Sequence, residues 1–158
     1  MPAIHEGAAV TAQAATLLGA ARLMEVPRSF TEQIPEKLGP TVPDLAPQAD
    51  EAVLTKSRFD ACAETGIAAR LLPGHHIIVA GCEAHVCVLQ TVLGLLEGGR
   101  EVAVVADATG SRAAANREAA LARMARHGAE IVTAEMVVFE WLGGADHPAF
   151  RKVIRLIK

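Results

Sequence analysis

Short apolar runs that pass directly into helical patterns recur along this chain, and this alternation limits the possible folds. The clearest case is an apolar run at residues 76–81, ending in a glycine, followed by a helical pattern at residues 85–97. Strands that alternate with helices form parallel sheets covered on both faces. The sequence therefore predicts one α/β domain over residues 1–158. Further strands are predicted at 26–31, 51–55, 101–106 and 129–132, and further helices at 8–24, 60–71, 111–125, 133–141 and 148–157.

Composition narrows the class of protein. The chain has 158 residues with 51% hydrophobic and 21% charged residues, which is typical of a globular domain with one core. A net charge of -3 without a Lys/Arg cluster argues against a nucleic-acid partner. The three cysteines lack metal-type spacing, which favours reduced thiols. Because no apolar run is long enough to span a membrane and no leader pattern is present, we expect a cytoplasmic protein without a membrane partner.

One segment, residues 32–50, does not follow the alternating pattern. Its prolines and glycines interrupt any regular element. A stretch of this length without regular structure is usually functional in a compact domain. We expect a loop that lies over a site or a subunit contact.

Cys87 is the first candidate functional residue. It falls in the first turn of the helix predicted at residues 85–97, just beyond the carboxyl end of a buried strand. The free N–H groups and the dipole of a helix N-terminus favour a thiolate, the nucleophilic form of cysteine. The alternative is that Cys87 is a small buried hydrophobic residue, and the pattern leaves both readings open. Cys62 is interpreted as a packing residue, and Cys82 lies in the turn.

Lys56 ends a predicted strand at the same edge of the sheet. A lysine there could lower the pKa of the Cys87 thiol and stabilise developing negative charge. A solvated lysine at a strand end is the more common situation, and Arg58 could take the same role.

Five other polar residues have less specific positions. Asp107 also ends a predicted strand, where capping is favoured over catalysis. Glu83 could orient a substrate or face solvent, and His85 could contact the site. His75 and His76 are expected on the surface at the opposite edge. We expect no metal and no cofactor, because the chain has no metal-ligand spacing and no phosphate-binding glycine pattern.

The segment from Gly81 to Thr91, GCEAHVCVLQT, resembles the nucleophile motif of the isochorismatase-like cysteine hydrolases. Similar motifs follow the family order elsewhere: TEQ at 31–33, LGPTV at 38–42, TKSRF at 55–59 and DATGSR at 107–112. The combination is most similar to the isochorismatase domain-containing subgroup. The resemblance implies a three-layer αβα fold with a six-stranded, Rossmann-like parallel sheet.

The same resemblance implies a triad of Asp, Lys and Cys, in which Cys87 matches the nucleophile and Lys56 the lysine. It implies a cis peptide between Cys82 and Glu83, and an oxyanion-binding turn over residues 82–84 with the N–H groups near Ala84 and Cys87. By the same resemblance, residues that could line the substrate pocket are Glu32, Gln33 and His85.

The chain departs from the family at its beginning. The family opens with a central strand that carries the triad aspartate, and neither is found before residues 1–7. This difference accounts for five expected strands instead of six, and our hypothesis is that the natural protein is longer.

We expect C–N hydrolysis of a small amide-type substrate by a homo-oligomer. The alternatives are a scaffold protein that keeps the fold without the chemistry and, last, a thiol redox protein.

Overall fold

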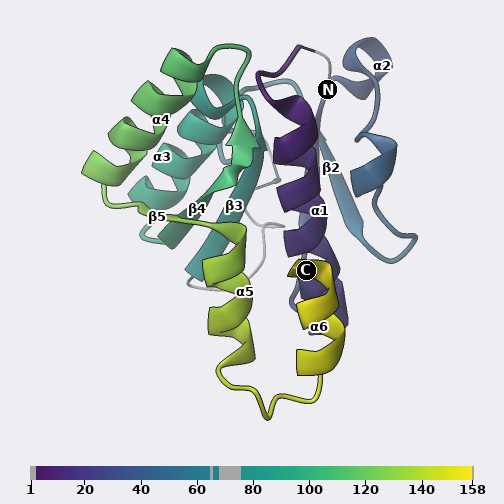
Figure 1. Ribbon diagram of the computed structural model, residues 1–158. Helices are drawn as coiled ribbons and strands as arrows, with labels where there is room; N and C mark the ends of the chain where they lie inside the picture. The colour runs from purple at the N-terminus through teal and green to yellow at the C-terminus, as the bar shows by residue number, and fades with distance from the viewer. Residues whose placement is uncertain (1–2, 65, 68–75, 158) are drawn as a thin grey trace.

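The structure, a computed structural model, describes residues 3–64, 66–67 and 76–157 (Figure 1). Five strands are found in this part of the chain, as the sequence predicts. They are β1 Ser29–Gln33, β2 Ala52–Lys56, β3 His76–Cys82, β4 Glu101–Gly110 and β5 Glu130–Val132. The α-helices are α1 Gly7–Leu23, α2 Pro35–Leu38, α3 Leu89–Glu97, α4 Ala114–Arg126, α5 Ala134–Leu142 and α6 Phe150–Ile157. Short helical turns at Pro43–Leu45 and Ala84–Val88 complete the described elements.

The strands form two parallel sheets and not one. β1 pairs with β2, from Ser29 opposite Ala52 to Gln33 opposite Lys56. The second sheet has the order β3-β4-β5. Among the described residues, no hydrogen-bonded ladder joins β1 to β3. The α/β class and the parallel pairing predicted from the sequence are confirmed, and the six-stranded sheet of the family is divided into two sheets in the described structure.

Helices cover both faces of the three-stranded sheet. On one face, Ala103 and Val105 of β4 pack in a cluster with Leu17 and Ala20 of α1 and with residues of α5. On the other face, Val102 and Val104 pack with residues of α3 and α4. Because successive side chains of a strand point to opposite faces, the apolar run of β4 contributes to both clusters. The result is a helix–sheet–helix arrangement, visible in Figure 1 as α1 and α5 on one side and α3 and α4 on the other.

Several element boundaries differ from the sequence prediction. Residues 32–50 are more regular than expected, since they include the end of β1, α2 and a short 3-10 turn. The described residues of the predicted helix 60–71 form turns and bends, and the remainder lies outside the described residues. β4 continues to Gly110 because its end pairs with Gly81 and Cys82 of β3, so Asp107 lies within a strand.

Candidate functional site

Cys87 lies in the first helical turn after β3, as predicted. β3 ends at Cys82, and the peptide bond between Cys82 and Glu83 is cis, as the family resemblance implies. The turn Ala84–Val88 is π-helical and continues into α3. The Glu83 carbonyl accepts hydrogen bonds from the N–H groups of Val86 and Val88, at 3.1 and 3.2 Å. Such π-helical turns occur frequently at functional sites, and the Cys87 side chain is half-buried here.

Two polar contacts fix this turn against the end of β4 and the start of α4. The Glu83 carboxylate accepts hydrogen bonds from the Arg112 backbone N–H at 2.9 Å and from its guanidinium. These bonds lower the pKa of Glu83 to about 2. His85 Nδ1 lies 3.0 Å from the hydroxyl of Ser111, and Asn116 lies 3.5 Å from its other ring nitrogen. Glu83 and His85 therefore have specific partners, and the role of Glu83 as a free solvent-facing carboxylate is wrong.

Lys56 is buried, and the expectation of a solvated strand-end lysine is wrong. Its residue exposure is 6%. The ammonium donates hydrogen bonds to Gln33 Oε1 at 2.6 Å and to the carbonyls of Arg58 and Phe59 at 3.0 and 3.1 Å. Gln33 is held in turn, because its amide nitrogen donates to the Ser57 carbonyl at 2.6 Å. The paired ends of β1 and β2 thus hold a cation surrounded by three neutral oxygen atoms.

A short set of contacts joins Lys56 to the helix that carries Cys87. The Phe59 carbonyl, which accepts from Lys56, also accepts from the Thr91 hydroxyl at 3.5 Å. That hydroxyl accepts from the Ala61 N–H at 3.0 Å. Thr91 follows Cys87 by four residues, and residues with this spacing are neighbours on a helix surface. The structure therefore brings the segments of both candidate catalytic residues to one edge of the strands. Thr91 was not identified from the sequence, although its spacing from Cys87 could have indicated it.

The other two thiols are held in the neutral form. Burial, followed by the charge of Asp60, raises the pKa of the Cys62 thiol to about 11. Its Sγ donates to the Thr91 carbonyl at 3.8 Å. Burial also raises the pKa of Cys82. The interpretation of Cys62 as a packing residue is consistent with this environment, although it lies in a turn and not in a helix.

Glu32 and Asp107 make structural contacts. Glu32 Oε1 accepts hydrogen bonds from the Thr41 N–H and hydroxyl, each at 2.7 Å, and so holds the segment that follows α2. Asp107 Oδ1 accepts from the Ala134 N–H at 2.9 Å, at the start of α5. Asp107 therefore caps the start of α5, and the prediction that it caps the turn directly after its strand is wrong.

An open cavity of about 490 Å³ lies at the opposite end of β1 and β2. Its lining includes Arg22, Arg28 and Glu51. Glu51 is buried and accepts hydrogen bonds from both arginines, with contacts of 2.6 Å to each. Because Arg28 and Glu51 precede β1 and β2 while Lys56 ends β2, this ion-pair cluster lies away from the candidate active site. No sequence pattern indicates this cluster, because its members come from three separate segments.

The described residues hold neither a metal-type cluster of side chains nor a membrane-spanning helix. In that part of the chain no three His, Cys, Asp or Glu side chains are grouped so that they could hold a metal ion. Nor does any helix there have the length and apolar character needed to cross a membrane. Among the predicted surface histidines, His76 is exposed as expected, whereas His75 lies outside the described residues.

Comparison with known proteins shows the family of this chain. Residues 1–136 match the Isochorismatase domain. The chain belongs to the isochorismatase domain family. Isochorismatase domain-containing protein 2 of Macaca fascicularis is 40% identical over 150 residues, which cover 94% of this chain and 73% of the relative.

Solved structures share the fold of this isochorismatase-family domain. The MAR1 ribonuclease of Caenorhabditis elegans has a TM-score of 0.93 and 37% identity, covering 99% of this chain and 82% of the other. The YcaC gene product of Escherichia coli, an octameric hydrolase of unknown specificity, has a TM-score of 0.80 and 25% identity, covering 95% and 82%. The family resemblance and the α/β architecture predicted from the sequence are thus confirmed.

Proposed function

We propose that this chain is a cysteine hydrolase that cleaves a C–N bond in a small amide-type substrate. The observation that carries the proposal is the joint placement of Cys87 and Lys56. Cys87 lies in a π-helical first turn after β3, and the buried ammonium of Lys56 is connected to the same helix through Phe59 and Thr91.

In the proposed reaction, the Cys87 thiolate attacks the carbonyl carbon of the amide and forms a C–S bond. The carbonyl π electrons move to oxygen, which becomes an oxyanion. N–H groups of the turn at Ala84 and Cys87, together with the Lys56 ammonium, stabilise that charge. Collapse of the intermediate breaks the C–N bond and expels the amine, which takes up a proton from solvent. Water then adds to the thioester carbon and the C–S bond breaks, which releases the carboxylic acid, the Cys87 thiolate and one proton to solvent.

The proton transfers of this reaction lack the residue that carries them in the family. The family resemblance assigns them to an aspartate that no residue of this sequence matches, and the three hydrogen bonds of Lys56 go to neutral oxygens. General acid–base catalysis is typically worth roughly 10²–10⁴-fold in rate. We therefore expect slow turnover by the 158-residue chain, with formation of the thioester less affected than its hydrolysis.

Two further features belong to the same proposal. The three cysteines are free thiols, which suits a reducing compartment such as the cytoplasm.

Met136 and Phe139 of α5 are exposed apolar residues, 48% and 43% accessible, and present a surface for self-association. An octameric state is recorded for YcaC of Escherichia coli. We propose a homo-oligomer on this basis.

The test is a screen of small primary amides with ammonia release as the readout. The Cys87→Ala variant is expected to lose activity by roughly three orders of magnitude or more. Cys62→Ala is the matched control, because it removes a thiol that burial keeps neutral. Retained activity in Cys87→Ala would contradict the proposed nucleophile. Hydrolysis of RNA in place of amides would contradict the proposed substrate class.

A second measurement examines the thiol directly. Iodoacetamide reacts with thiolates, so Cys87 should be labelled faster than Cys62 near neutral pH. Mass spectrometry of tryptic peptides gives both rates in one sample. If the two residues react at the same rate, Cys87 is not activated and the proposal fails.

A further inference from the structure

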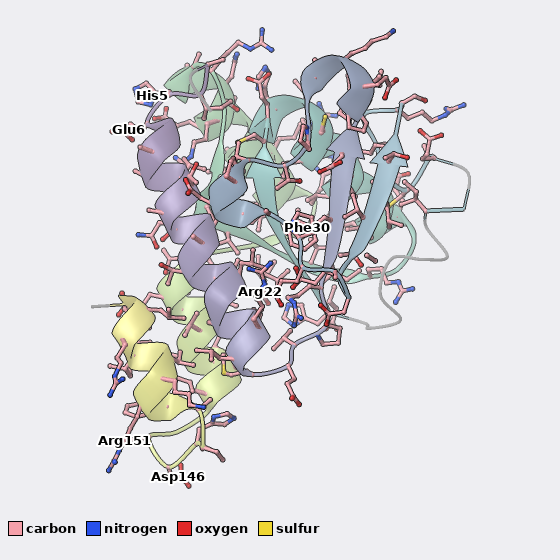
Figure 2. The ribbon with its side chains drawn as sticks, turned by 90° about the vertical axis from the view of Figure 1, so that its right-hand side faces the viewer. His5, Glu6, Arg22, Phe30, Asp146 and Arg151 are labelled. Carbon is pink, nitrogen blue, oxygen red and sulfur yellow. The ribbon has the colours of Figure 1, made fainter. Side chains whose placement is uncertain are left out.

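The open cavity at the starts of β1 and β2 has no part in the reaction proposed for Cys87. Its volume is about 490 Å³, and it lies at the opposite end of these strands from Lys56. Figure 2 shows Arg22 of α1 beside the starts of the two strands. Arg28 directly precedes β1 and Glu51 directly precedes β2, so three separate segments meet here. Small-molecule sites are concave and fix their ligands through a few convergent polar groups.

The two guanidinium groups of this cavity are fixed in place but not fully used. Arg22 donates through Nε and Nη2 to Glu51, and Arg28 donates through Nε to the same carboxylate. Nη1 of Arg28 donates to the carbonyls of Ala21 and Val26, at 3.3 and 2.6 Å. Nη1 of Arg22 and Nη2 of Arg28 have no acceptor among the described residues. Because the rest of each group is held, these N–H groups are preorganised to bind a further carboxylate.

Two other carboxylates line the same cavity. Glu25 and Asp50 are exposed, and within the described part of the chain neither carboxylate is hydrogen-bonded or in an ion-pair contact. The hydrogen bond to Glu51 is the main cause of the raised pKa of Arg22, and the charge of Asp50 contributes to it, so Asp50 lies within electrostatic reach of the guanidinium. Two unpaired carboxylates repel a simple anion and attract an ammonium group.

The backbone of Glu25 supports a role for its side chain. Its φ is 57°, in the left-handed region, directly after the last residue of the α1 cap. The chain reverses here, and the Val26 N–H donates to the Ala21 carbonyl at 2.8 Å. Glycine is the usual residue at this place in a helix end, since a side chain strains the left-handed conformation. Strain of this kind is concentrated at functional positions, and here it places a carboxylate in the cavity wall.

From these observations we propose that the cavity is a second small-molecule site, which binds a zwitterion of the α-amino acid type. The carboxylate of the ligand accepts hydrogen bonds from the free N–H groups of Arg22 and Arg28. Its ammonium group lies between Asp50 and Glu25. The side chain of the ligand is small and polar, because Pro27 is the one apolar residue among the described residues of the lining. The inference does not depend on the proposed hydrolase reaction.

L-Serine is the probe, because it has both charged groups and a small polar side chain and contains no amide bond. Its analogue 3-hydroxypropionate lacks the ammonium group, and ethanolamine lacks the carboxylate. Binding to the full chain is measured by calorimetry near neutral pH, and the NMR signals of the arginine Nε–H groups report where the ligand binds. We expect serine to bind and each analogue to bind roughly tenfold or more weakly, because each has lost one set of charge-assisted hydrogen bonds.

Substitution of the two exposed carboxylates tests the ammonium half of the site. Asp50→Asn and Glu25→Gln should each weaken serine binding roughly fivefold or more. Neither should weaken the binding of 3-hydroxypropionate, which has no ammonium group. Asp44→Asn is the matched control, since Asp44 is an exposed aspartate that does not line the cavity. Glu25→Gly should also weaken serine binding, yet raise the melting temperature because glycine relieves the left-handed strain, which separates binding from stability.

Several results would overturn this site. Equal binding of serine and 3-hydroxypropionate would mean that the cavity binds anions only, and equal binding of serine and ethanolamine would mean that it binds cations only. Serine binding that is insensitive to both carboxylate substitutions, or that leaves the Nε–H signals of Arg22 and Arg28 unchanged, would place the ligand elsewhere. Absence of serine binding up to about 50 mM would contradict the proposal directly.

Discussion

Glu51 is the carboxylate with the largest number of charged partners in the described structure, and its replacement by Gln tests how the two-stranded sheet is held. Its Oε1 accepts from Arg22 Nε at 2.9 Å and from Arg28 Nε at 2.6 Å. Its Oε2 accepts from Arg22 Nη2 at 2.6 Å and from the Gln48 N–H at 2.8 Å. The Glu51 side chain is only 2% exposed, whereas those of Arg22 and Arg28 are 23% and 19% exposed.

These bonds lower the pKa of Glu51 from 4.5 to about 2, with the hydrogen bond from Arg22 as the largest cause. Since one pKa unit corresponds to about 1.4 kcal/mol, complete linkage would give about 3.4 kcal/mol. Solvent in the neighbouring open cavity screens the charges, and we reduce this figure to about 1–2 kcal/mol. Removing the carboxylate also leaves two guanidinium groups together, so Glu51→Gln should cost about 2 kcal/mol at pH 7.

The pH dependence has a definite direction. Because the pKa of Glu51 is lower in the folded state, its stabilisation is complete well above pH 4.5 and is lost as the pH falls toward 2. The difference in unfolding free energy between the unmodified protein and Glu51→Gln should therefore shrink to about half or less at pH 3.

Urea denaturation at pH 7, 5 and 3 measures this difference, and the melting temperature at pH 7 should fall by about 4–8 °C. Asp50→Asn is the matched control, because it removes the neighbouring carboxylate of the same cavity without touching the Glu51 bonds. Its effect should stay within about 0.5 kcal/mol. A Glu51→Gln difference that is the same at pH 7 and pH 3 would refute the reasoning.

Three other substitutions have expected outcomes. Thr109 is fully buried, and its hydroxyl has no hydrogen-bond partner among the described residues. Thr109→Val should therefore raise the unfolding free energy, measured by urea denaturation, by about 0.5–1 kcal/mol. A decrease would mean that the hydroxyl has a hydrogen-bond partner. The Thr133 hydroxyl accepts from the Met136 N–H at 3.3 Å, so Thr133→Ala should cost about 1 kcal/mol by the same assay, and no loss would mean that this cap is inactive. Glu83→Gln removes the surface ion pair with Arg112 and should change the unfolding free energy by less than about 1 kcal/mol. The same substitution should slow the iodoacetamide labelling of Cys87, because the ion pair holds the turn. Unchanged labelling would mean that the pair does not position the turn.

The segment around Cys87 could be predicted from the sequence because its signals are local. The apolar residues of β3, the glycine at position 81 and the periodicity of the following helix all act within a few residues of one another. The same is true of α1, predicted at 8–24 and found at Gly7–Leu23. Where the neighbouring sequence decides the conformation, the prediction agrees with the structure.

The burial of Lys56 could not be predicted because it depends on distant partners. Gln33 precedes Lys56 by 23 positions, and the two carbonyls come from the chain turning back at Arg58 and Phe59. The error at residues 60–64 has the same origin. The Ala61 N–H donates to the Thr91 hydroxyl, 30 positions away, and the Asp60 carboxylate binds the Cys62 N–H at 2.7 Å. Such side-chain bonds compete with a helix that local periodicity alone favours.

The proposed active site depends on how the two sheets are joined. Lys56 and Gln33 come from the two-stranded sheet, while Cys87 follows β3 of the three-stranded sheet. Without a ladder between β1 and β3 in the described structure, their relative position rests on α1 and on the contact of Ala61 with Thr91. Catalytic groups must be held within a fraction of an ångström of the productive geometry. Substitutions that loosen these contacts should therefore lower stability and Cys87 reactivity together.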